Sequence, residues 1–297
     1  MLKKWIKILK GNSDLHVNQD EGKIYSKDKV KGYYNNLTEK INWYQGYDKN
    51  GIPLVMNYNG DRIYFPITIS QYALGNYDLY LMTNEKIYYK QFINSVRWLI
   101  DNQDIQGGWN VLNSMGCKYS AMAQGEGVSV LTRAFIEFND SKYLNAAVKA
   151  SELMLKPIKN GGTARYVKDN LYFEEFAKLK PSLVLNGWIF TIFGLFDIVK
   201  LSDDKNYADM LNITLKTLEG ELVNYDCGYW SYYDQCGHLA SPFYHRLHIA
   251  QLNVLYDLFH IKNFKVISER WESYLLNKFK KAKAIIFKIW QKIKEPG

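Results

Sequence analysis

LVLNGWIFTIFGLFDIVKLSDDKNYADMLNITLKTLEGELV, residues 183–223, carries the pattern that decides the fold. Apolar residues recur at spacings of three and four on both sides of the short polar turn LSDDKN, which predicts two helices joined as a hairpin. The same pattern returns in three more pairs of stretches: 70–82 with 90–103, 128–138 with 143–155, and 245–259 with 264–279. The chain is therefore predicted to be mainly α.

The connections between these helices alternate in length. Short polar turns close each pair, and longer Gly- and aromatic-rich links precede the next pair: DIQGGWNVLNSMG (104–116), KNGGTARYVKDNLYFEEF (159–176) and YDCGYWSYYDQCGHLASPF (225–243). Helical hairpins with their long loops on one side are typical of an α/α barrel, a toroid in which inner helices line a cup. We expect the functional site to lie under the long loops.

The first part of the chain has a different pattern. GIPLVMNYNGDRIYFPI, residues 51–67, reads as two short strands about an Asn-Gly turn, a strong signal for a β-hairpin. We therefore divide the chain into an N-terminal extension with this hairpin (1–62), an α/α-barrel catalytic domain (63–276) and a basic amphipathic tail (277–297).

Composition and charge narrow the class of partner. The chain has 24 Tyr, 14 Phe and 8 Trp, and carbohydrate sites use the apolar faces and polar edges of Tyr and Trp, although a Tyr-rich core would give the same count. The formal net charge of +8 favours a polyanion: nucleic acid, anionic lipid or acidic polysaccharide. No nucleic-acid-binding signature is present, so no nucleic-acid partner is expected. Cys117, Cys227 and Cys236 show neither metal spacing nor an even count, which fits a reducing compartment.

Both ends of the sequence are basic. MLKKWIKILKG at residues 1–11 is too short and too broken in its apolar part for a secretory signal, and no stretch approaches the roughly 20 apolar residues that span a bilayer. KFKKAKAIIFKIWQKIK at residues 278–294 predicts a basic amphipathic helix, which would lie on an anionic membrane, dock a partner or pack on its own domain. We expect a cytoplasmic protein, held at the inner membrane face if the first alternative applies.

Five motifs in order carry a family resemblance. They are YFPITISQYALGNYDLYL (64–81), DNQDIQGGW (101–109), AMAQGEGVSVLTRAF (121–135), EEFAKLKPSLVLNGWIFTIFGLFDI (174–198) and YHRLHIAQLNVL (244–255). Together they resemble the C-terminal catalytic domain of the D-glucuronyl C5-epimerases, which act on heparan-type polysaccharides, over about residues 60–275. The resemblance implies an α/α barrel, a polymeric uronate substrate such as heparosan, no organic cofactor and a homodimer.

The implied reaction sets clear chemical requirements. Inverting C5 of a uronate needs a base on one face, an acid on the other, and donors for the carboxylate as it gains enolate character. By resemblance Glu175 is the base, Tyr244 carries the proton on the opposite face, and Tyr233 assists. The family has a Tyr directly after its Glu-Glu pair, where this chain has Phe176. Because Phe cannot transfer a proton, altered or absent chemistry stays open.

Other residues are candidates for binding the substrate. His245 would orient or charge-stabilise the substrate carboxylate, and Arg246 or Arg165 would hold a carboxylate or sulfate in bidentate fashion. Glu174 and Asn186 complete this set of polar candidates. For Arg246 the alternative is an ordinary surface position, and for a paired Glu in a loop it is a solvated charge.

The stretch YSAMAQGEG, residues 119–127, holds two glycines around one acid at the start of an inner helix. We interpret Gly125 and Gly127 as positions where the backbone approaches a sugar ring, with Gln124 and Glu126 hydrogen-bonding its hydroxyls. The alternative is tight packing between helices.

Aromatic and histidine residues add two further expectations. Trp109 and Tyr119 lie in or beside the long loops and would stack on sugar faces. His238, His245 and His248 fall within eleven residues but lack a helix-borne pair with ligand spacing, so no metal site is predicted. His248 is interpreted as a hydrogen-bonded wall residue.

The sequence thus favours a C5-epimerase and leaves three alternatives. A polysaccharide lyase begins with the same proton abstraction but expels the C4 substituent. A catalytically inactive uronan-binding protein would explain Phe176. A glycoside hydrolase needs two acids across one bond, a geometry that sequence does not reveal.

Overall fold

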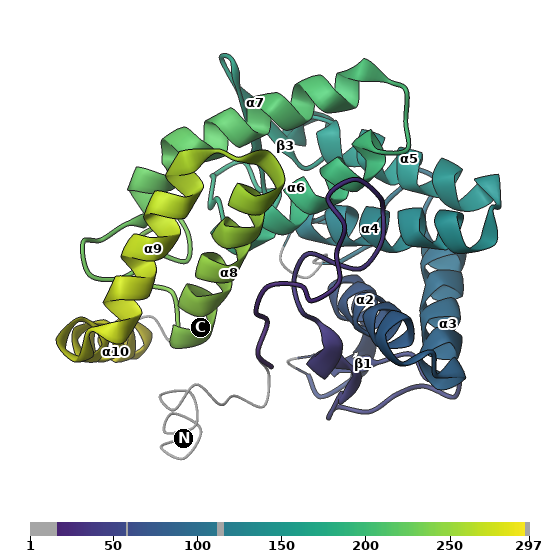
Figure 1. Ribbon diagram of the computed structural model, residues 1–297, viewed down its shortest axis with the longest axis horizontal. Coiled ribbons are helices and arrows are strands. Elements are labelled where there is room, and N and C mark those ends of the chain that lie inside the picture. Colours follow the sequence, from purple (N-terminus) through teal and green to yellow (C-terminus); the bar gives the residue numbers. More distant parts are fainter. Residues whose placement is uncertain (1–16, 58, 112–115, 295–297) are drawn as a thin grey trace.

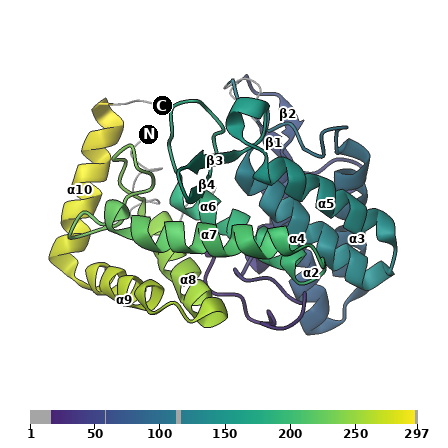
Figure 2. The same cartoon turned by 90° about the horizontal axis from the view of Figure 1, so that it is seen from above.

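The computed structural model describes residues 17–57, 59–111 and 116–294 (Figure 1). The basic start and part of the first long link lie outside the described residues. Successive helical hairpins form an arc, with α4 and α6 in its middle and the first and last hairpins at its two ends (Figures 1 and 2). The hairpins are α2 (Pro66–Thr83) with α3 (Lys86–Asn102), α4 (Ala121–Phe138) with α5 (Ser141–Leu155), α6 (Leu185–Val199) with α7 (Lys205–Glu221), and α8 (Pro242–Phe259) with α9 (Lys262–Leu276). The predicted α/α architecture is confirmed.

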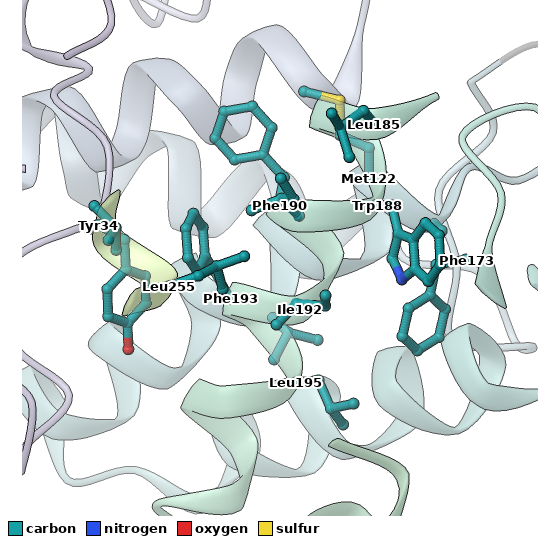
Figure 3. Packing of buried hydrophobic residues seen from close by; sticks show 14 of the residues in the cluster. Tyr34, Met122, Phe173, Leu185, Trp188, Phe190, Ile192, Phe193, Leu195 and Leu255 are labelled. Carbon is teal, nitrogen blue, oxygen red and sulfur yellow. The ribbon is translucent and has the colours of Figure 1, made fainter. Parts of the chain in front are cut away.

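Hydrophobicity separates inner from outer helices. In α6, 13 of 15 residues are buried, because this helix is apolar on all sides. Figure 3 shows Phe190, Phe193 and Leu195 leaving α6 toward different neighbours, including Leu255 of α8. The outer helix α7 buries only one face, built from Tyr207, Leu211, Thr214, Leu215, Thr217 and Leu218.

Two glycines let the central inner helices approach closely. A Cβ at Gly125 of α4 would lie 2.6 Å from the Cα of Thr191, and one at Gly194 of α6 would lie 2.2 Å from the carbonyl oxygen of Gly125. No side chain larger than hydrogen fits at either position without moving backbone. Gly125 therefore serves helix packing, and its interpretation as a point of approach for a sugar was wrong.

The segment 17–41, with the 3-10 helix η1 (Thr38–Ile41), crosses the open side of the arc between α2 and α8 (Figures 1 and 2). It closes the C-terminal ends of the inner helices through a buried network, here called the Arg133 network. The Arg133 guanidinium of α4 pairs with Asp197 of α6 at 2.6 Å and donates to the Gly32 carbonyl at 2.8 Å. The Tyr34 hydroxyl donates to the second Asp197 oxygen at 2.7 Å.

Two small hairpins interrupt the helical pattern. β1 (Leu54–Met56) and β2 (Arg62–Tyr64) pair antiparallel around the Asn-Gly turn, which confirms that prediction. β3 (Ala164–Val167) and β4 (Asn170–Phe173) form a second hairpin inside a link that was expected to be loop. Its turn contains Lys168 in the left-handed region at φ 52°.

The remaining described elements are η3 (Ile158–Asn160), η4 (Leu222–Tyr225) and the terminal helix α10 (Lys278–Lys294). In the described parts of the chain, none of the helices combines the length and the apolar character needed to cross a bilayer.

Candidate active site

The first turns of the inner helices hold the loops that carry the predicted catalytic residues. The Ala121 amide, first in α4, donates to the Glu174 carbonyl at 3.0 Å, and the Leu185 amide, first in α6, donates to the Tyr233 carbonyl at 3.0 Å. Tyr244 lies in the first turn of α8, whose N-cap Ser241 accepts from the Tyr244 amide. Helix N-termini thus bring Glu175, Tyr233 and Tyr244 to one end of the barrel.

Glu175 follows β4 and rests against the first turn of α6. A Cβ at Gly187 would lie 2.6 Å from Glu175 Oε2, so the glycine leaves the space that the carboxylate occupies. Oε2 is shielded from solvent and has no hydrogen-bond partner among the described residues. Burial without a compensating donor raises the pKa of Glu175 from 4.5 to about 7. Glu175 is therefore poised to gain or lose a proton near neutral pH.

Tyr233 and Tyr244 form a pair beside this carboxylate. Their ring centroids lie 4.7 Å apart, and their hydroxyls share a hydrogen bond. Burial first, and then the charge of Glu175, raise the pKa of each phenol well above its ordinary value. Both phenols therefore stay protonated at neutral pH and can act as acids. The structure brings all three predicted catalytic residues together.

Glu126 reaches the same region from the second turn of α4. Its side chain is fully buried, Oε1 accepts from Gln71 of α2 at 2.9 Å, and Oε2 has no partner in the described residues. Burial raises the pKa of Glu126 to about 8, opposed by Gln71 and Lys40 and reinforced by Glu175. Burial also lowers the pKa of Lys40, in η1, to about 8. Two carboxyls and one amine thus titrate close to neutral pH.

The helix termini add a positive field at this end. At this end the N-termini of α2, α4 and α6 lack a side-chain cap, and Ser241 caps α8. Of the outer helices, α5 and α7 are capped by Asp140 and Asp204, whereas α3 and α9 have no side-chain cap. Uncapped N-termini carry partial positive charge from their amide groups and favour an anion nearby. The uncapped N-termini of α2, α4 and α6 therefore suit a negatively charged ligand at this end of the barrel.

Glu174 and Arg165 do not face a ligand. The Glu174 carboxylate is fully buried and accepts from Arg165, from the Ser182 amide and hydroxyl, and from the Leu183 amide, at 3.0 to 3.2 Å. The remaining nitrogens of Arg165 donate to the carbonyls of Leu179 and Lys178. The predicted substrate-binding roles of Glu174 and Arg165 are corrected: they fix the loop that presents Glu175.

The predicted contact between His245 and a substrate carboxylate is also corrected. His245 is fully buried, its ring stacks on Trp230 at 3.7 Å, and its two nitrogens lie 2.8 Å from the Ser231 hydroxyl and 3.0 Å from the Trp271 carbonyl. Burial lowers the pKa of His245 to about 3, so the ring is neutral. His248 is buried beside it, 3.1 Å from the same hydroxyl, as expected of a wall residue.

The first long link is likewise held by residues that were predicted to contact sugar. Gln124 is fully buried and bonds to the Trp109 amide and to the carbonyls of Gly107 and Ala150. Trp109 is 1% exposed and donates to the Leu99 carbonyl, and a Cβ at Gly127 would lie 2.4 Å from its ring. Tyr119 is buried and donates to Asp104 at 2.6 Å. The binding roles of Gln124, Trp109 and Tyr119 are therefore wrong, because packing uses these groups.

Two predicted ligands keep free groups. Asn186, in the first turn of α6, is buried and its Oδ1 has no partner among the described residues. Arg246, in the first turn of α8, is partly exposed and makes no hydrogen bond or ion pair with the described part of the chain.

Phe176 is partly buried next to Glu175. Across the described residues, no group of three or more His, Cys, Asp or Glu side chains is arranged to hold a metal ion.

Sequence reasoning missed Lys40, Gln71 and Gly187. Lys40 lies in a polar segment without helical or strand pattern, and only the fold brings it to Glu126. Gln71 falls on the buried face of a predicted inner helix, where a polar residue is a usable signal. Gly187 precedes a Trp in an apolar helix start, and nothing local distinguishes it from a packing glycine.

Comparison with known proteins shows which family the chain belongs to. The family profile described as the D-glucuronyl C5-epimerase C-terminus matches residues 110–273. The chain belongs to this family. It is 31% identical over 216 residues to a D-glucuronyl C5-epimerase of Caenorhabditis elegans, an alignment that covers 63% of this chain and 35% of the worm protein. It is also 32% identical over 141 residues to an uncharacterized protein of Methanocaldococcus jannaschii, covering 46% of each.

This member of the family spans about a third of the worm enzyme and about half of the archaeal protein. Among solved structures it is similar to a cellobiose 2-epimerase from Spirochaeta thermophila, with a TM-score of 0.55 and 10% identity over 80% of this chain and 66% of that one. It is also similar to a glycoside hydrolase family 76 mannosidase of Bacteroides thetaiotaomicron, with a TM-score of 0.50 and 15% identity over 88% of this chain and 81% of that one. These structures share the fold.

Proposed function

We propose that this chain inverts C5 of D-glucuronate to L-iduronate within a polymer. The observation that carries the proposal is the unpartnered Glu175 oxygen beside two hydrogen-bonded phenols. Membership of the epimerase family supports the reaction class, and similarity to the worm D-glucuronyl C5-epimerase supports glucuronate as substrate.

In the proposed mechanism Glu175 takes the C5 proton. A carboxylate whose pKa is about 7 is a stronger base than an ordinary glutamate and is still largely ionised at slightly alkaline pH. The electron pair left at C5 spreads onto the uronate carboxyl group, which becomes enolate-like. The uncapped helix N-termini and the Lys40 ammonium supply positive charge for that group.

Reprotonation then comes from the opposite face. Tyr244 transfers its phenolic proton to C5, and Tyr233 stabilises the resulting phenolate through their hydrogen bond. To complete the cycle, Glu175 loses its proton to solvent and the Tyr244 phenolate takes one from solvent. The phenols fit the role of acid because both are protonated at neutral pH.

Phe176 favours a second candidate, a uronan-binding protein without catalysis. The family has a Tyr at this position, and Phe offers neither donor nor acceptor. In the proposed mechanism Tyr233 and Tyr244 suffice. In the alternative, the free groups at this end only bind hydroxyls and carboxylates.

The test is exchange at C5. The pure protein is incubated with heparosan and related uronans in heavy water and the polymer is followed by NMR, with the Glu175→Gln variant as control. Deuterium at C5 with new iduronate signals, absent with the variant, is the expected result. Unsaturated uronate ends would show a lyase instead. Binding without exchange on every polymer would sink the catalytic proposal in favour of the binding one.

A further inference from the structure

The terminal helix α10 packs on the protein with its polar side. Ala284 is buried, and Gln291 accepts from the Leu239 amide at 3.0 Å and donates to the Gly237 carbonyl at 2.8 Å. Lys280 lies 3.9 Å from the ring of Tyr274. Most amphipathic helices on globular proteins do the reverse, burying their apolar side against the core.

The opposite side of α10 presents an apolar stripe to solvent. Phe279, Ile286, Trp290 and Ile293 are 88%, 67%, 47% and 73% exposed. Their spacings of seven, four and three residues place them along one face of the helix. We call these four residues the α10 stripe. Leu276, at the end of α9 and three residues before Phe279, is 76% exposed and lengthens the apolar region.

Exposed apolar side chains aligned on one element indicate a surface that is covered in use. The charges around the α10 stripe indicate what covers it. α10 contains seven lysines and no acidic residue, and Lys278, Lys283 and Lys294 are exposed. A second copy docking through the same face would set two lysine-rich helices against each other. The occupant should therefore offer an apolar region to the α10 stripe and negative charge to the lysines beside it.

We propose that α10 docks this protein on an anionic lipid bilayer, with the α10 stripe inserted at the level of the headgroups. A helix of 17 residues, roughly 25 Å long, is suited to lying in the plane of the interface, and its lysines reach the lipid phosphates. Gln291 also holds residues 237 and 239 of the loop that carries Tyr233, so docking sets this loop next to the membrane. The inference is independent of the proposed epimerase reaction.

The experiment is vesicle flotation with the full chain. Vesicles of phosphatidylcholine alone are compared with vesicles that contain about a third phosphatidylglycerol. The test variant is Ile286→Ser/Trp290→Ser, which removes half of the α10 stripe and keeps every lysine. The matched control is Ile105→Ser/Val223→Ser, which removes two apolar side chains that are 95% and 70% exposed elsewhere on the surface.

We expect the wild type and the matched control to float with the anionic vesicles and not with the neutral ones, and the stripe variant to bind roughly 10- to 100-fold more weakly. Retention of the lysines in the variant separates the stripe from general attraction by basic residues, including those at residues 1–10. Equal binding of wild type and stripe variant would overturn the proposal. So would the absence of vesicle binding together with a concentration-dependent dimer, seen by sedimentation velocity, that the stripe variant abolishes.

Discussion

The two ends of this barrel treat buried charge in opposite ways. At the closed end the Arg133 guanidinium pairs with Asp197 and donates to the carbonyls of Gly32 and Ser129. The Tyr34 hydroxyl donates to the second Asp197 oxygen. At the other end Glu175 and Glu126 each keep an oxygen without a partner among the described residues. A buried charge that is fully paired serves structure, whereas one left unpaired is retained at the expense of stability and indicates a site.

One residue at the closed end is an exception to this division. Asp78 of α2 is fully buried near Arg133, and its Oδ1 has no partner in the described residues. Burial raises the pKa of Asp78 to about 8, opposed by Arg133. It is therefore protonated at neutral pH, which lowers the penalty of its position. The predictions below test whether the two ends differ in function as they do in bonding.

The largest effect is expected from two neighbouring glutamates. Glu175→Gln should lower the rate of C5 exchange by about 10³-fold, because it removes the base, without loss of stability. Glu174→Gln should lower the free energy of unfolding by about 2 kcal/mol and leave the exchange rate per folded molecule within a fewfold. NMR exchange assays and urea unfolding measure the two quantities. The assignment would be contradicted if Glu174→Gln lowered the exchange rate and Glu175→Gln lowered the stability instead.

The closed end should respond in stability alone. Arg133→Met leaves Asp197 buried without its cation and should lower the free energy of unfolding by about 3–5 kcal/mol. The double variant Arg133→Met/Asp197→Leu removes both charges and should recover most of this loss. Urea denaturation of the three proteins gives the comparison. If the double variant were less stable than the single one, the pair would not be the stabilising unit.

The two phenols should differ in effect. Tyr244→Phe removes the proposed acid and should lower the exchange rate by about 10²-fold. Tyr233→Phe removes one hydrogen bond to Tyr244 and should lower the rate by a factor of about five, equivalent to roughly 1 kcal/mol. Steady-state exchange rates of the two variants on one polymer measure the two losses. A larger loss for Tyr233→Phe would exchange their roles.

A smaller effect is expected at Gly187, where a methyl group would displace the Glu175 carboxylate. Gly187→Ala should lower the rate by roughly tenfold or more, since small misplacements of a catalytic group are costly, while stability stays equal or rises by up to about 1 kcal/mol. Gly220→Ala in α7 is the matched control, because a Cβ there meets no atom within 4 Å. The control should gain stability and keep full activity. Full activity of Gly187→Ala would show that Glu175 need not occupy this position.

The last prediction concerns the dependence of stability on pH. The folded-state pKa of Glu126, about 8, exceeds its ordinary 4.5, so the folded protein binds more protons than the unfolded chain between these values. Its contribution to stability is therefore present at low pH and is lost as pH rises from about 5 to 8, at no more than about 1.4 kcal/mol per pH unit. Glu126→Gln should make this decline shallower by the share of Glu126, leaving the shares of Glu175 and Asp78. Unfolding midpoints of the wild type and the variant at pH 5, 6, 7 and 8 measure the difference. If the two sets of midpoints ran parallel against pH, the assignment would be contradicted.

Much of the fold follows from local pattern. The helical period and the Asn-Gly turn between β1 and β2 are local signals, and the predicted elements follow them. The second hairpin was missed because the length of its link suggested loop, although ARYV and NLYF alternate around a tight turn.

The site was less predictable because its meaning depends on partners distant in sequence. Glu174 and Glu175 are alike in sequence, yet only Glu174 is surrounded by donors, and these come from residues 165, 182 and 183. His245 has the right residue type for a ligand, but Ser231 and Trp271 occupy its nitrogens. Lys40 reaches Glu126 only because Gly75 lets the Leu37 carbonyl pack against α2.

The central claim is that Glu175 is a carboxylate held unpaired so that it titrates near neutral pH. ¹³C NMR of protein labelled at the glutamate side-chain carboxyl carbons, followed from pH 4 to 9 and assigned by the signal missing in Glu175→Gln, reports this directly. A titration midpoint near pH 7 is the result that the account predicts. A midpoint near the ordinary value of 4.5 would contradict it, because Glu175 would then be an ordinary solvated acid.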